Sequence, residues 1–219
     1  EIDEAETAVV SHEFIASRAE AWRGIRNLLV ATQSRSPRFG CYGLHEWAMV
    51  YGLEQAEVRH EQAPLRLGRG EIAEVVESAG LQCSHYDAYR FFTKAAIPFN
   101  RQPLQRETQI DFEQPGCIHA NMDLYKWAYK IAPAVSSELL LKTFRHALRL
   151  RELDMQAAPY DLSEWNLAPV KIETPEGRAE YVSRQRELAE VAATLRLELS
   201  AAIEAILNLV SDQSSRSNA

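Results

Sequence analysis

The sequence predicts a mainly α (α+β) protein, a single domain of long amphipathic helices with a small β element around residues 71–86. Apolar residues recur at helical spacing over long stretches near both ends of the chain. Only one short segment in the middle favours strands. With 219 residues, 46% of them apolar and 25% charged, the chain is long and apolar enough to bury the core of one domain.

The first helix is expected over residues 3–32, where charges separate the recurring apolar side chains. Pro37 follows in a polar segment and disfavours helix in the residue before it, so residues 1–36 form an N-terminal helix and linker. The apolar positions of this helix are Val9, Val10, Phe14, Trp22, Ile25, Leu28 and Leu29.

A less regular region is expected over residues 37–133. A turn rich in glycine and aromatic residues precedes a short helix at about 44–51, and a loop follows over 54–70. Apolar and β-branched residues on both sides of Ala79-Gly80 favour two strands, although a short helix over 71–78 competes with them. Three prolines predict an irregular excursion over 94–115.

Helices return in the last part of the chain, which we divide into a helical frame over residues 134–210 and a polar tail over 211–219. Helices are expected at 118–132 and 136–156, the second with Ser136 or Ser137 as its N-cap. Thr174-Pro175-Glu176 predicts the start of a final helix that extends to about residue 210.

Charge and hydropathy restrict the partners of the protein. The net charge of −7 argues against tight, non-specific binding to nucleic acid, which needs an excess of cations. No apolar run reaches the length of a membrane span, and the acidic first residues do not resemble a signal peptide. We therefore expect a cytoplasmic protein with no membrane partner. The three cysteines cannot all pair, which favours reduced thiols.

Residues 37–133 also contain the candidate site, since His45, His60, His85 and His119 all lie there. His119 and Asp123 are four residues apart on an expected helix and share a face, as a general base and its orienting carboxylate would. His85 and Asp87 are two apart and would point to the same side of a strand. These four residues are the catalytic candidates, and His60 is expected to be solvated.

Aromatic residues in the same region favour a stacking pocket for a flat or cationic ligand. We expect this pocket to bind a small molecule or a flipped base, and its candidate residues are Trp47, Tyr86, Tyr125, Lys126 and Trp127.

A metal centre is an alternative use of the same histidines. His45, His85 and His119, with Asp87 or Asp123, form a set of imidazole and carboxylate ligands that suits a divalent iron, zinc or manganese ion. His45 precedes Glu46 directly, so on a helix the two side chains diverge, and we expect His45 to face the site.

Several blocks of the chain resemble a family of uncharacterised bacterial proteins commonly labelled 3-methyladenine DNA glycosylase. The resemblance extends from residue 37 to about 195, and its blocks are 37–51, 58–67, 83–92, 114–133, 151–155, 159–162 and 172–177. It implies a DNA-repair hydrolase that cleaves a base–sugar N-glycosidic bond. In such an enzyme Asp123 or Asp87 would orient the attacking water.

Two other functions stay open on the sequence alone. One is a metal-dependent hydrolase or a non-haem iron oxygenase that acts on a small molecule. The other is a non-catalytic binding module whose histidines and acids only hold the core. Phosphate-binding loops, the G-x-S-x-G elbow, H-E-x-x-H and the dinucleotide fingerprint are missing, which argues against the enzyme classes that they mark.

Overall fold

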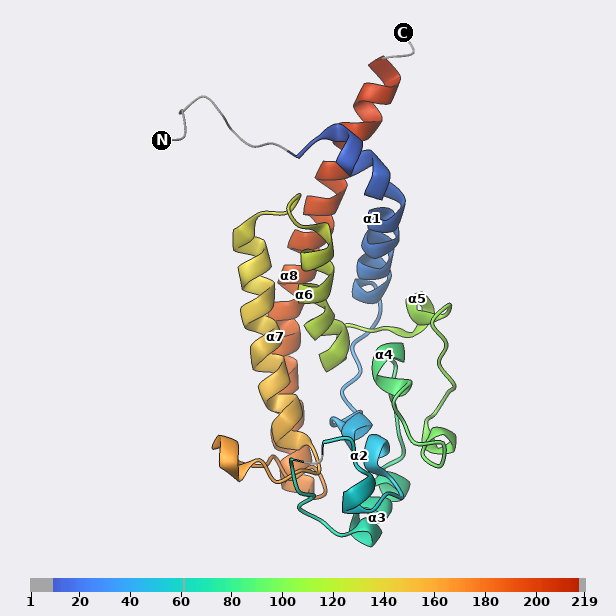
Figure 1. The fold of residues 1–219 in the computed structure, drawn as a ribbon, viewed down its shortest axis with the longest axis vertical. Helices are drawn as coiled ribbons and strands as arrows, with labels where there is room; N and C mark the ends of the chain where they lie inside the picture. Colours follow the sequence, from blue (N-terminus) through green and yellow to red (C-terminus); the bar gives the residue numbers. More distant parts are fainter. Residues whose placement is uncertain (1–9, 61, 217–219) are drawn as a thin grey trace.

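Four long helices form a bundle that occupies the upper part of the molecule (Figure 1). The computed structural model describes residues 10–60 and 62–216, with side chains through residue 209. The mainly α prediction is confirmed, and each of the four helices was expected. They are α1 (His12–Gln33), α6 (Ile118–Ile131), α7 (Ser137–Ala157) and α8 (Pro175–Arg216).

The lower part of the molecule consists of short helices and the loops that join them (Figure 1). These segments pack around the lower ends of α6, α7 and α8, where the candidate site lies. The short α-helices are α2 (Leu44–Val50), α3 (Arg69–Ala79), α4 (Tyr86–Tyr89) and α5 (Gln109–Phe112). The 3-10 turns are η1 (Gln55–Glu57), η2 (Ile97–Phe99) and η3 (Ser163–Trp165).

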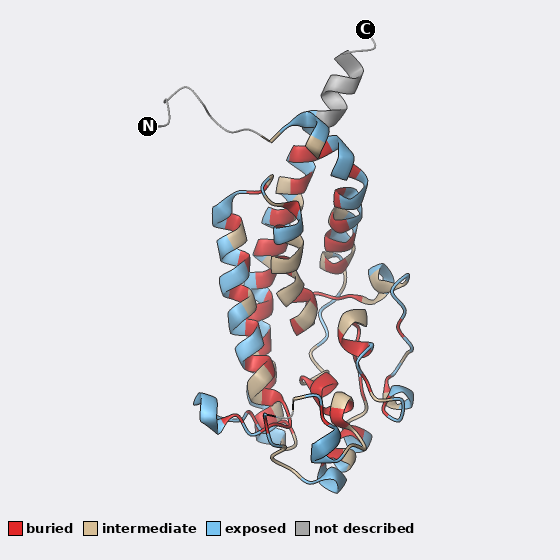
Figure 2. Ribbon diagram, viewed as in Figure 1, coloured by how far each residue is buried: buried red, intermediate tan, exposed pale blue. Residues whose placement is uncertain are grey.

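Two hydrophobic clusters hold the chain together. The bundle cluster joins α1, α6, α7 and α8 through residues such as Trp22, Leu124 and Leu199. The lower cluster joins α2, α3 and α4 to the end of α7 and includes Trp47 and Leu153. Buried residues therefore follow the inner faces of the long helices and continue into the short ones (Figure 2). Helices α6 and α7 contribute to both clusters. Their lower ends, with Ile118 and Leu153, belong to the lower cluster, and their upper parts belong to the bundle cluster.

The long helices are amphipathic, and their polar faces stay in contact with solvent (Figure 2). In the part of the chain that the structure describes, none of them holds an apolar stretch long enough to cross a membrane.

The prediction of a small β element around residues 71–86 is wrong, and the competing prediction of a short helix is correct. Ile72, Val75 and Val76 recur at helical spacing and are all buried on one face of α3. The Glu71 side chain accepts a hydrogen bond from the Gly68 N–H at the start of α3, and Gly80 follows the helix with a positive φ of 65°. Among the described residues only isolated bridges occur, Leu65 with Tyr160 and Leu81 with Asn100.

Two predicted helix ends also differ from the structure. Helix α1 begins at His12, because the Ser11 hydroxyl accepts a hydrogen bond from the Phe14 N–H, and the predicted start over residues 3–9 lies outside the described residues. Helix α8 continues to Arg216, beyond the predicted end at 210. Of the predicted polar tail over 211–219, residues 211–216 are therefore helical and 217–219 lie outside the described residues.

Two glycines within helices should respond in opposite ways to alanine. A Cβ at Gly177 would lie 2.0 Å from the Lys171 carbonyl oxygen, so the backbone must move, and we expect Gly177→Ala to lower the free energy of unfolding by about 2 kcal/mol. A Cβ at Gly24 would meet nothing within 4 Å, so Gly24→Ala should raise that free energy by about 0.5–1 kcal/mol. Equilibrium urea unfolding measures both. Equal stability of the two variants would contradict this packing.

Candidate metal centre

Helix α2 is held against the lower end of α7. Its N-cap is Gly43, which has a positive φ of 72° and lies close to Ala157 and Tyr181, where a larger residue would be strained and crowded. One turn later, the Trp47 indole N–H donates a hydrogen bond of 2.8 Å to the Ala157 carbonyl. His45 and Glu46 lie between these two contacts in the sequence, and the contacts direct their side chains toward α7.

The start of α6 is fixed by a turn that Gln114 organises. The Gln114 side-chain oxygen accepts hydrogen bonds from the N–H groups of Arg38 and Gly116, each 2.8 Å long. The Gly116 carbonyl accepts a further bond of 2.7 Å from the Gln185 side chain on α8. The turn thus sets the position of His119 in the first turn of α6.

Three side chains from three different helices converge at this place: His45 from α2, His119 from α6 and Asp154 from α7, here called the His45 set. Each offers one ligand atom, and the three atoms lie within 4.8 Å of one another. The His45 Nε2 atom is 3.3 Å from Asp154 Oδ1, and His119 Nε2 is 3.9 Å from Asp154 Oδ2. Two imidazoles and one carboxylate with further positions open form a common ligand set for zinc and non-haem iron.

The His45 set leaves buried polar atoms without hydrogen bonds. His45 Nε2 and Asp154 Oδ1 are both shielded from solvent and have no hydrogen-bond partner, although they are close together. Bonds of about 2.0–2.1 Å to a tetrahedral metal separate two ligand atoms by about 3.3–3.4 Å, which matches this spacing. A buried polar group without a partner is destabilising, so a cation bound between the two would satisfy both.

Cationic and anionic groups meet at the His45 set. Asp154 is fully buried and Glu46 nearly so, and Arg151 contacts both carboxylates, at 2.6 Å and 3.4 Å. Burial disfavours the charged form of His45, but the Asp154 and Glu46 carboxylates, 3.3 Å and 3.6 Å away, raise its pKa above the usual value. Burial lowers the pKa of His119 well below its usual range, and repulsion from His45 and His85 lowers it further. A neutral imidazole is the form that binds metal.

A second set of possible ligands, here called the His85 set, lies beside the first and differs from it. It consists of His85, Glu113 and Asp123, and the His85 ring is 5.5 Å from the His119 ring. The His85 Nδ1 atom accepts a hydrogen bond from the Ala88 N–H, so the proton of the neutral ring is on Nε2. That nitrogen lies 3.2 Å from Asp123 Oδ2 and donates to it.

The remaining groups of the His85 set also have partners. Gln109 donates a hydrogen bond to Glu113, and the Lys126 ammonium contacts Asp123. None of the three side chains has a buried polar atom that lacks a hydrogen bond, in contrast to His45 and Asp154. Hydrogen bonding thus satisfies the His85 set, and the His45 set is the better metal candidate.

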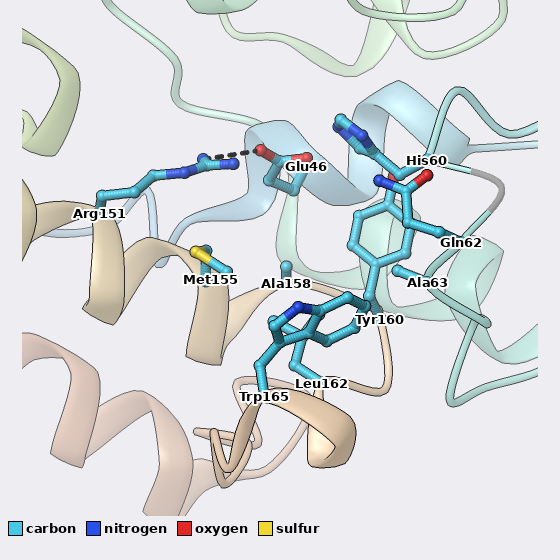
Figure 3. A pocket seen from close by; sticks show the side chains of 10 residues that line it. All are labelled: Glu46, His60, Gln62, Ala63, Arg151, Met155, Ala158, Tyr160, Leu162 and Trp165. Carbon is cyan, nitrogen blue, oxygen red and sulfur yellow. Dashed lines mark hydrogen bonds and ion pairs between the residues drawn. The ribbon is translucent and has the colours of Figure 1, made fainter.

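Two cavities adjoin the His45 set. The metal-side cavity, of about 370 Å³, is lined by His45 and His119 and also by His85 and Asp123. The aromatic cavity, of about 290 Å³, lies on the other side of Glu46 and His60, which line both cavities. Figure 3 shows its side chains, with Glu46 and Arg151 at one end and Trp165 at the opposite end.

The structure brings the predicted histidines together but pairs them differently. His119 and Asp123 share a face of α6, yet Asp123 bonds His85 and Lys126 and not His119. The predicted His85–Asp87 pair on a strand is not formed. His85 is the N-cap of α4, and Asp87 makes ion pairs with Arg106 and Lys126 at 2.8 Å and 3.2 Å.

The expected stacking pocket is not assembled around His119. Trp47 is a fully buried core residue, and the Arg106 guanidinium lies 5.0 Å from the Tyr86 ring. Tyr125 contacts Tyr129 and Phe144 along the bundle, and Trp127 packs against the bundle cluster. None of the four predicted aromatic residues lines the two cavities described above.

Sequence reasoning missed Asp154 and misplaced Glu46 and His60. Asp154 lies four residues after Leu150 on the buried face of α7, and a carboxylate within an apolar stripe is a signal that could have identified it. The expected divergence of His45 and Glu46 is wrong, because both are buried and 3.6 Å apart. His60 was expected to be solvated but is half-buried, and its ring contacts Tyr160.

Comparison of the chain with protein-family models, with curated proteins and with solved structures found no match. The geometry of the two sets of ligands is therefore the basis for a proposed function.

The two sets predict different metal contents for matched variants. The protein refolded or reconstituted with zinc should hold about one equivalent, and Asp154→Asn should hold almost none, because it loses the one carboxylate of the His45 set. Asp123→Asn should keep about one equivalent, because Asp123 belongs to the hydrogen-bonded set. Elemental analysis after gel filtration measures all three. Loss of metal in Asp123→Asn with retention in Asp154→Asn would reverse our choice of site.

Proposed function

We propose that the protein is a metal-dependent hydrolase that acts on a small molecule. The observation that carries this proposal is the pair of buried atoms His45 Nε2 and Asp154 Oδ1, which face each other at 3.3 Å without a hydrogen bond. His119 completes the set of three possible ligands, and both His45 and His119 line the metal-side cavity. A divalent ion held by these residues would supply an activated water.

The groups around the metal-side cavity suit hydrolysis. Hydrolysis needs a proton to reach the leaving group, and His85 and Asp123 line the same cavity as His45 and His119. The Lys126 ammonium contacts Asp123 and Asp87 from the other side and holds both carboxylates in place. The His85 set can thus exchange protons beside the metal without binding it.

The same ligand set would also accept iron, so oxygenase chemistry is the nearest alternative. Hydrolysis agrees better with the surroundings, because the metal-side cavity contains two histidines beyond the ligands and several charged groups. These additional residues are His60, His85, Asp87 and Asp123.

Cleavage of a base–sugar bond, which the sequence resemblance implies, is less well supported by the geometry. Asp87 and Asp123, the carboxylates expected to orient water, are both paired with Lys126. The aromatic residues expected to stack on the base lie elsewhere.

Zinc-loaded protein should hydrolyse at least one class of substrate in a panel of small esters, amides, phosphoesters and nucleosides. Activity should disappear with the metal chelated and return with added zinc. In His119→Ala, which lacks a ligand, it should fall by about 100-fold or more. The initial rate of product formation, followed by chromatography, measures the activity of each sample.

The control is His12→Ala, which replaces an exposed histidine at the first position of α1 that lines neither cavity, and this variant should hydrolyse at the normal rate. Oxygen consumption by iron-loaded protein without hydrolysis of any substrate would contradict a hydrolase. Metal-independent release of 3-methyladenine from alkylated DNA would instead support the function that the resemblance implies.

A further inference from the structure

The aromatic cavity contains two further buried atoms that lack hydrogen bonds. They are the Tyr160 hydroxyl and Glu46 Oε2, and both residues line the cavity. Burial raises the pKa of Tyr160, so its hydroxyl keeps its proton and can donate it in a hydrogen bond. Neither atom is needed for the proposed metal ligand set, and each would gain a hydrogen bond from a polar group bound beside it.

The Arg151 guanidinium is a third polar group at the same end of the cavity (Figure 3). Its Nη1 atom contacts Glu46 and Asp154, whereas its other nitrogens make no hydrogen bond to any residue that the structure describes. This end of the cavity therefore has donors in Arg151 and Tyr160 and an acceptor in Glu46.

The rest of the cavity is apolar. Met155, Ala158 and Leu162 contribute to its wall, and Trp165 closes the end opposite Glu46 (Figure 3). The Trp165 side chain is 45% exposed, so it is accessible to a ligand in the cavity. A flat or branched apolar group fits this wall.

We propose that this cavity binds the acyl part of a carboxamide, a substrate class for the hydrolase. This inference rests on the proposed function. An amide supplies an oxygen that accepts from Tyr160 or Arg151 and an N–H that donates to Glu46. An ester lacks the donor, and a carboxylate would lie against the negative charge of Glu46.

In the reaction, the oxygen of water bonds to the carbonyl carbon, the C–N bond breaks and the departing nitrogen takes a proton. The products are an apolar carboxylic acid and an amine, and no oxidant or reductant is needed. Because Glu46 and His60 line both cavities, the acyl part can lie in the aromatic cavity while the amine side extends into the metal-side cavity.

The test is calorimetric titration of zinc-loaded full-length protein with N-methylphenylacetamide and with methyl phenylacetate. We expect the amide to bind about tenfold more tightly, because only the amide donates to Glu46. Glu46→Gln should abolish this preference, since a glutamine side chain can offer either a donor or an acceptor. Zinc content is measured in every sample.

Tyr160→Phe removes one hydroxyl and should weaken the binding of both probes by about tenfold while the melting temperature stays the same or rises, because the lost group has no partner. Tyr181→Phe is the matched control. Its hydroxyl is also buried without a hydrogen bond, but it does not line the aromatic cavity, so binding should not change.

Protein that holds zinc but binds the two probes equally, or binds neither, overturns the carboxamide inference and leaves the proposed hydrolase standing. Protein that takes up no zinc overturns the proposed function itself. Equal weakening in Tyr160→Phe and Tyr181→Phe would show that the effect is general to the core and would also overturn the inference.

Discussion

The structure depends most on how two buried carboxylates are neutralised. Glu46 and Asp154 lie beside His45 where α2 meets the lower end of α7, and Arg151 is the cation that contacts both. Removing charge from water is expensive unless each ion is paired and hydrogen-bonded, and here one oxygen of each carboxylate makes no hydrogen bond. The metal ion that we propose would pair with these carboxylates where α2 meets α7.

The helical frame explains how such a costly arrangement is held. Helices α6 and α7 are antiparallel neighbours, so the first turn of α6 and the last turns of α7 lie at the same end of the bundle. Each helix packs its remaining length against α8 through the bundle cluster, far from the charges. On the other side, Trp47 joins α2 to the Ala157 carbonyl. Apolar burial over the long helices thus compensates for polar burial at one end.

The sequence predicted the parts of the fold that local rules determine. Ser136 caps α7 and Pro175 begins α8 as expected, because capping and the fixed φ of proline act within a few residues. The segment around Ile72 allows both a strand and a helix, because a short apolar run satisfies both periods. The local caps at Glu71 and Gly80 and the packing of α3 against α2 favour the helix.

The candidate site was predicted in composition but not in pairing. His45, His85 and His119 do gather, yet Asp123 pairs with His85, a residue 38 positions away, because the N-cap of α4 lies beside α6. Asp154 was missed because it lies 35 positions after His119 on another helix, a relation that spacing along one element cannot reveal.

The contrast between the two sets of ligands is the strongest physical argument for chemistry at this place. Both consist of histidine and carboxylate, and both are largely buried, so composition and burial do not separate them. Hydrogen bonds do: the His85 ring donates and accepts, whereas His45 Nε2 and Asp154 Oδ1 do neither. A core built only for stability would lose nothing by satisfying both sets. The proposed metal ion would bind to the polar atoms that make no hydrogen bond in the His45 set, beside the hydrogen-bonded His85 set and the two cavities that share Glu46.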